Sequence, residues 1–99
     1  MDVNNIDTTN LIERTVIVIA DRGHVWVGNS YQTDDAWLYL FNAKCIRVWG
    51  TSKGLAELID GPTKETVLDA YMPTLVVANR AVIGILPCHD TPWIKHLKP

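Results

Sequence analysis

The sequence predicts a mainly β domain with short helices, in which about five or six strands form a small curled antiparallel sheet or an SH3-like barrel. Short β-branched and aromatic segments recur along the chain, turn residues separate them, and helical periodicity is confined to brief stretches. No repeat or linker divides the 99 residues, which is a one-domain length. We therefore expect a flexible, polar N-terminal segment over residues 1–12 and one domain over residues 13–99.

The first hairpin is predicted over residues 15–28. Residues 15–20 are dense in β-branched side chains, which is typical of a strand covered on both faces. Residues 21–23 form a tight turn, and residues 24–28 alternate as the returning strand. His24 and Trp26 share one face of that strand.

Two more strands are predicted after a turn at residues 33–35. Residues 36–41 alternate as a third strand, Asn42 ends it, and residues 45–49 form a fourth strand. The aromatic face of the third strand carries Trp37, Tyr39 and Phe41, and one face of the fourth carries Cys45, Arg47 and Trp49.

A short helix is predicted over residues 55–59, because Thr51 or Ser52 can cap its start and Gly61-Pro62 follows its end. Residues 63–73 are weakly patterned and predict a loop, with at most a short strand at residues 66–68.

Apolar runs at residues 74–78 and 82–86 predict two strands joined as a hairpin by Asn79-Arg80. Thr91-Pro92 is typical of a helix start, and it places Trp93 and Leu97 on one face of a final turn. 

Composition disfavours several classes of protein. The formal net charge is −2, whereas proteins that bind duplex nucleic acid usually carry a basic excess. No apolar run approaches the roughly 18 residues that span a membrane, and the start lacks a basic and apolar leader. Two cysteines are too few for a disulfide framework, so we expect a cytosolic protein with reduced thiols.

The densest group of catalytic-type side chains is Cys88-His89-Asp90, with His96 seven residues later. A thiolate beside imidazole can act as a nucleophile, and these residue types can also bind a metal. However, adjacent residues on an extended chain point in different directions, and zinc ligands are normally paired two to four residues apart. The sequence therefore predicts neither catalysis nor a metal or other cofactor.

The turn at residues 50–54, Gly-Thr-Ser-Lys-Gly, is the best candidate for an anion site. Backbone N–H groups at a helix start, the hydroxyls of Thr51 and Ser52, and Lys53 suit a phosphate group. The alternative is an ordinary strand-to-helix turn capped by Ser or Thr, which is a favoured way to begin a helix.

Arg47 and Trp49 share a strand face just before this turn. An arginine beside exposed aromatic rings provides a stacking surface for bases, and Trp37, Tyr39 and Phe41 could extend it. The same aromatic face could instead be an oligomer interface. The four tryptophans could also be core residues of a small domain.

The chain resembles a family of short phage-encoded proteins of unknown function. The matching segments run in the same order, at residues 16–19 (VIVI), 28 (G), 43–49 (AKCIRVW), 55–58 (LAEL), 61 (G) and 85–88 (ILPC). Cys45 and Arg47 stand where that family has an arginine and a tryptophan. The resemblance implies a phage protein made in the host cytoplasm, and such proteins are often accessory factors that counter host defences.

These patterns lead to one main hypothesis and two alternatives. The main hypothesis is a non-enzymatic, homo-oligomeric anti-defence protein that sequesters a small nucleotide-type signal. Bases would stack on Trp26, Trp37 or Trp49, and Arg47, Thr51, Ser52 and Lys53 would contact phosphates. The first alternative is a protein–protein module that inhibits a host enzyme or serves in phage assembly. An enzyme using Cys88 and His89 ranks last.

Overall fold

The computed structural model describes residues 10–99, which form a mainly β fold as predicted. These residues contain seven strands: β1 (Val16–Ala20), β2 (Val25–Gly28), β3 (Ser30–Thr33), β4 (Trp37–Val48), β5 (Val67–Leu68), β6 (Met72–Ala78) and β7 (Val82–Pro87). Four short 3-10 helices connect or follow them: η2 (Asp21–Gly23), η3 (Leu55–Asp60), η4 (Asn79–Ala81) and η5 (Ile94–His96). Residues 1–9 of the predicted flexible segment lie outside the described residues, and Ile12 pairs with Tyr31.

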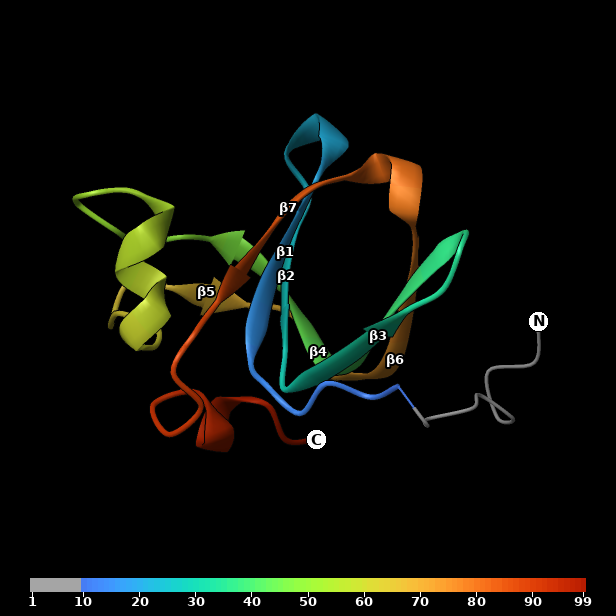
Figure 1. Ribbon diagram of the computed structural model, residues 1–99. Coiled ribbons are helices and arrows are strands. Elements are labelled where there is room, and N and C mark those ends of the chain that lie inside the picture. The colour runs from blue at the N-terminus through green and yellow to red at the C-terminus, as the bar shows by residue number, and fades with distance from the viewer. Residues whose placement is uncertain (1–9) are drawn as a thin grey trace.

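All strand pairings are antiparallel, and the sheet curls into a half-barrel (Figure 1). β2 and β3 follow one another along the same side of β4 in one continuous register, from Trp26 opposite Cys45 to Thr33 opposite Leu38. β5 and β6 line the other side of β4, while β1 and then β7 extend the sheet from β2. The predicted curled antiparallel sheet is therefore confirmed.

The prediction that Asn42 ends a strand is wrong, because β4 continues through it. Asn42 adopts a left-handed conformation with φ of 51°, and Asn29 lies opposite it in the ladder. The Asn29 N–H donates to the Phe41 carbonyl (3.1 Å), and its side-chain oxygen accepts a bond from the Asn42 amide (3.0 Å). The Tyr71 hydroxyl donates to Asn42 Oδ1. These long-range bonds keep β4 paired with its neighbours at Asn42, where the left-handed conformation bends the strand.

This bend, which we call the asparagine corner (Asn29 and Asn42), changes which side chains face inward. Before it, the inward residues of β4 are Leu38 and Leu40, and after it the inward residue is Ala43. The row of Trp37, Tyr39 and Phe41 is therefore not continued by Cys45 after the corner. Gly28 is required here, because a Cβ at this position would lie 2.5 Å from Leu40 Cγ and 2.8 Å from the Phe41 carbonyl oxygen.

The predicted hairpin at Asn79-Arg80 is also wrong, although both of its strands exist. β6 pairs with β4, whereas β7 pairs with β1 at the other edge of the sheet. The sheet curls enough for the short η4 turn to connect these two edges (Figure 1). The prediction rested on the closeness of the two strands in the sequence. Because the sheet is curled, η4 can join them although they do not pair with each other.

The core has two layers, with β1 between them. Val16 and Val18 pack inside the curled sheet, and Ile17 packs on its other side. That outer layer is covered by Leu58 of η3 and by the C-terminal segment with Trp93 and Leu97. Both the two-sided burial of β1 and the shared face of Trp93 and Leu97 are confirmed.

Candidate functional site

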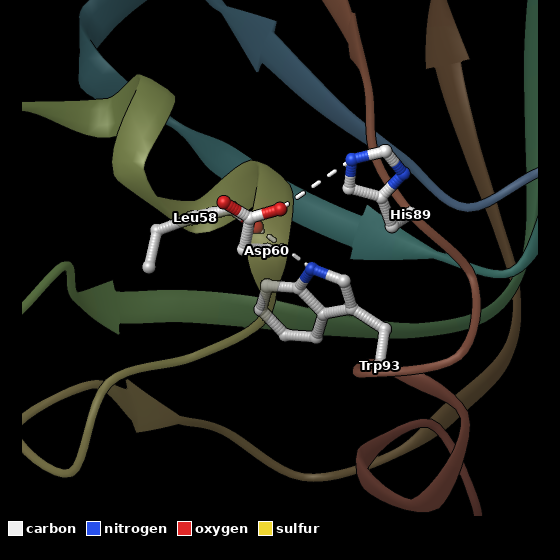
Figure 2. Close-up of polar contacts among 4 residues, drawn as sticks. All are labelled: Leu58, Asp60, His89 and Trp93. Carbon is white, nitrogen blue, oxygen red and sulfur yellow. Dashed lines mark hydrogen bonds and ion pairs between the residues drawn. The ribbon is translucent and has the colours of Figure 1, made fainter.

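The four tryptophans occupy three different environments. Trp37 begins β4 and Trp49 follows its end, and their side chains are 43% and 42% exposed. Trp26 is half-buried and stacks on His24, with ring centroids 5.5 Å apart. Trp93 is fully buried, and its indole N–H donates to the Leu58 carbonyl over 2.8 Å (Figure 2). Two tryptophans are therefore available to a ligand or partner.

The predicted site residues do not form one site. Trp37 and Trp49 lie at opposite ends of β4, and at about 3.3 Å per residue the path between them is roughly 40 Å. Trp26 lies between them, opposite Cys45 in the ladder. A single small ligand cannot stack on both exposed rings, so each end of β4 has to be considered separately.

At the Trp49 end, the turn after β4 is packed against a neighbouring loop. Gly50 has φ of 67°, and a Cβ there would lie 2.5 Å from the Thr66 nitrogen. The Thr66 hydroxyl donates to the Trp49 carbonyl and the Thr63 hydroxyl to the Gly50 carbonyl, each over 2.7 Å. Gly50, the first glycine of the predicted anion turn, is therefore explained by its backbone conformation and its close packing against Thr66.

The backbone groups predicted to bind phosphate already have an internal partner. The N–H groups of Ser52 and Lys53 donate to Glu57 Oε2, over 3.1 and 2.9 Å. The predicted cap by Thr51 or Ser52 is wrong, because Gly54 precedes η3 and no side chain caps it. A phosphate at this turn would have to displace the Glu57 carboxylate.

The Arg47 side chain is exposed, but it forms an ion pair. Its guanidinium lies 2.5 Å from an Asp69 carboxylate oxygen. The Asp69 N–H in turn donates to the Cys45 carbonyl over 2.9 Å. Burial raises the pKa of the Cys45 thiol, and the Asp69 charge raises it further, so this thiol is a poor nucleophile at neutral pH.

Exposed apolar side chains gather beside this ion pair. Val48 and Val67 face each other across the β4–β5 ladder and are 46% and 41% exposed. Trp49 follows Val48 directly, and its carbonyl is bound by Thr66, the residue before Val67. We call Arg47, Val48, Trp49, Val67 and Asp69 the β4–β5 end surface. Val48 and Val67 were not among the predicted site residues, because exposure of a valine cannot be read from an alternating strand pattern.

At the Trp37 end, a pocket of about 300 Å³ lies between the β3–β4 turn and η4. Its lining consists of Asp35, Ala36, Trp37, Ala78, Asn79 and Arg80. Among the predicted site residues, only Trp37 lines it. Asn79 and Arg80 were interpreted as hairpin turn residues, and only the curl of the sheet reveals their position beside Trp37.

The walls of this pocket are held together by hydrogen bonds. The Asn79 backbone N–H donates to the Ala36 carbonyl (2.9 Å), and its side-chain amide donates to the Asp34 carbonyl (2.7 Å). The Asp34 carboxylate accepts bonds from the N–H groups of Ala36 (2.9 Å) and Trp37 (2.8 Å). These bonds, with a smaller contribution from the Tyr39 hydroxyl, lower the pKa of Asp34, so its carboxylate is charged at neutral pH.

Cys88, His89 and Asp90 do not converge on one site. Cys88 is 1% exposed, and burial raises the pKa of its thiol to about 11. His89 Nε2 lies 3.4 Å from an Asp60 carboxylate oxygen (Figure 2), and Asp90 Oδ1 accepts a bond from the Thr15 N–H over 2.6 Å. Within residues 10–99, no three His, Cys, Asp or Glu side chains are arranged to hold a metal ion.

Comparison with protein-family models, curated proteins and solved structures gives no match. The resemblance to short phage proteins therefore stays a prediction. In the part of the chain that the structure describes, no helix is long and apolar enough to cross a membrane.

Proposed function

We propose that this chain is a protein-binding module that docks on another protein through the β4–β5 end surface. The observation that carries the proposal is that Val48, Trp49 and Val67 are each exposed at the same end of the sheet, where Val48 pairs with Val67 and Trp49 follows Val48. An apolar and aromatic centre with charged residues at its rim is the typical composition of a protein interface. Here the Arg47–Asp69 pair provides the charged rim.

The contacts at this end favour a protein over the nucleotide-type signal. The N–H groups of Ser52 and Lys53 bind Glu57, and the Arg47 guanidinium binds Asp69. A phosphate would compete with both carboxylates, whereas an apolar partner surface would leave these contacts intact. The resemblance to phage proteins makes a host enzyme or a phage assembly component the expected class of partner.

The test compares two variants of the full chain. Trp49→Ala removes the aromatic ring of the surface, and Ile83→Ala removes a side chain that is 72% exposed on β7, which pairs with β1 rather than with β4 or β5. A protein captured from host lysate is identified, purified and titrated against both variants. A central tryptophan is worth about 2 kcal/mol or more at an interface, so we expect Trp49→Ala to weaken binding by about 30-fold.

Ile83→Ala is expected to bind like the wild type. Equal affinity for Trp49→Ala and wild type, with both folded by circular dichroism, would overturn the assignment of this surface. Calorimetric titration of the wild type with cyclic dinucleotides tests the other hypothesis, and tight binding that Trp49→Ala abolishes would replace the protein partner with a nucleotide.

A further inference from the structure

We propose that the pocket beside Trp37 binds a small zwitterionic ligand, one that carries a guanidinium or alkylammonium cation together with a carboxylate. This inference does not depend on the β4–β5 end surface, which lies at the other end of β4. The pocket volume of about 300 Å³ suits a ligand the size of an amino acid.

Two unpaired charges of opposite sign line the pocket. Within residues 10–99, no carboxylate lies within ion-pair distance of Arg80, and no cationic side chain lies within that distance of Asp35. Asp35 belongs to the β3–β4 turn and Arg80 to η4, so the two charges come from different walls. A ligand with both charges can pair with each of them, whereas a singly charged ligand leaves one unpaired.

Trp37 favours the cation of such a ligand. Its indole is 43% exposed and lines the pocket, and an aromatic face attracts a guanidinium or ammonium group placed over it. Asp34, next to Asp35 in the β3–β4 turn, also carries a charged carboxylate, so this region holds two carboxylates and one guanidinium. This balance disfavours a ligand with several phosphates.

The pocket is pre-organised for binding. Asn79 connects η4 to the β3–β4 turn by two hydrogen bonds, and Trp37 is paired with Ala78 in the ladder. The walls therefore need little ordering when a ligand enters, which lowers the entropic cost of binding.

Three probes and three variants test this inference. The probes are L-arginine, argininamide, which lacks the carboxylate, and adenosine monophosphate. The variants are Arg80→Gln, Asp35→Asn and, as a control, Arg22→Gln, which changes an exposed arginine in the η2 turn. Binding is followed by the NMR signal of the Trp37 indole N–H, which is assigned with a Trp37→Phe variant.

We expect arginine to shift the Trp37 signal and to bind about 3- to 5-fold more tightly than argininamide, as one exposed ion pair allows. Arg80→Gln is expected to abolish this difference, Asp35→Asn to weaken both ligands, and Arg22→Gln to change neither. The absence of a shift with arginine in the folded wild type would overturn the proposal. So would tighter binding of adenosine monophosphate, or an unchanged preference for arginine in Arg80→Gln.

Discussion

The two ends of β4 both present an exposed tryptophan, but their surroundings differ. Next to Trp49, Arg47 is paired with Asp69, and two valines are exposed. Next to Trp37, neither Arg80 nor Asp35 has such a partner among residues 10–99, and a pocket lies between two walls. Paired charges beside apolar residues suit a broad protein contact, whereas unpaired charges in a hollow suit a small charged ligand. The environment of each ring, rather than the residue type, indicates its role.

The turn that shapes the Trp49 end gives the largest expected effect. In Gly50→Ala, the new Cβ would overlap the Glu65–Thr66 backbone, which cannot move aside as a flexible side chain can. The left-handed φ of 67° adds strain for alanine. We expect the free energy of unfolding to fall by about 3 kcal/mol or more, measured by urea denaturation.

Gly23→Ala is the matched control for this substitution. Gly23 has a similar φ of 78°, but within residues 10–99 no atom beyond its chain neighbours lies within 4 Å of an added Cβ. Its substitution should therefore cost only the conformational strain, about 1 kcal/mol. Equal losses in the two variants would show that the contact with the Glu65–Thr66 peptide does not hold the Trp49 end in place.

The sequence predicted the strands better than it predicted how they associate. The β-branched run of β1 is buried on both faces as expected, because the density of such residues is itself the signal. Asn42 is predicted to end a strand, but β4 continues through it with Asn42 in a left-handed conformation. Its bonds to Asn29 and Tyr71 reach 13 and 29 residues along the chain, and no local pattern reports them.

The candidate sites were predictable only in part, because they too depend on contacts between residues that are far apart in the sequence. The sequence left open which aromatic residues are exposed: Trp37 and Trp49 are, whereas Tyr39, on the same predicted strand face as Trp37, is buried. The sequence alone could not show whether the N–H groups of Ser52 and Lys53 are open to an anion or already bound by Glu57, as they are. The position of Arg80 beside Trp37 depends on the curl of the whole sheet.

The asparagine corner connects the two ends of β4, and its loss should have an intermediate effect. Asn42→Ala removes the bonds to Asn29 and Tyr71 and places alanine in a left-handed conformation. We expect a loss of about 2 kcal/mol in the free energy of unfolding. Asn42→Gly removes the same bonds without the strain and should recover about 1 kcal/mol of it. Identical stabilities would mean that the left-handed conformation is not maintained in solution.

The smallest expected effect concerns Asp34 at the Trp37 end. The N–H groups of Ala36 and Trp37 bind its charged carboxylate and lower its pKa below the ordinary value of 3.8. A carboxyl group with a lowered pKa in the folded state stabilises the fold above its unfolded pKa, and this contribution is lost as the pH falls through its folded pKa. The wild type should therefore lose stability below about pH 4 partly through this group. Because Asp34 is exposed to solvent, the change should be small.

Thermal unfolding of Asp34→Asn and Asp35→Asn between pH 2.5 and 6 measures this contribution. Asparagine at position 34 does not titrate, so the difference in melting temperature from the wild type should be greatest above pH 4 and should narrow below it. Asp35 makes no hydrogen bond through its carboxylate within residues 10–99, so Asp35→Asn should run nearly parallel to the wild type. If Asp34→Asn also ran parallel throughout, the turn beside Trp37 would not be held by this carboxylate. The pocket walls would then depend on the Asn79 hydrogen bonds and the pairing of Trp37 with Ala78.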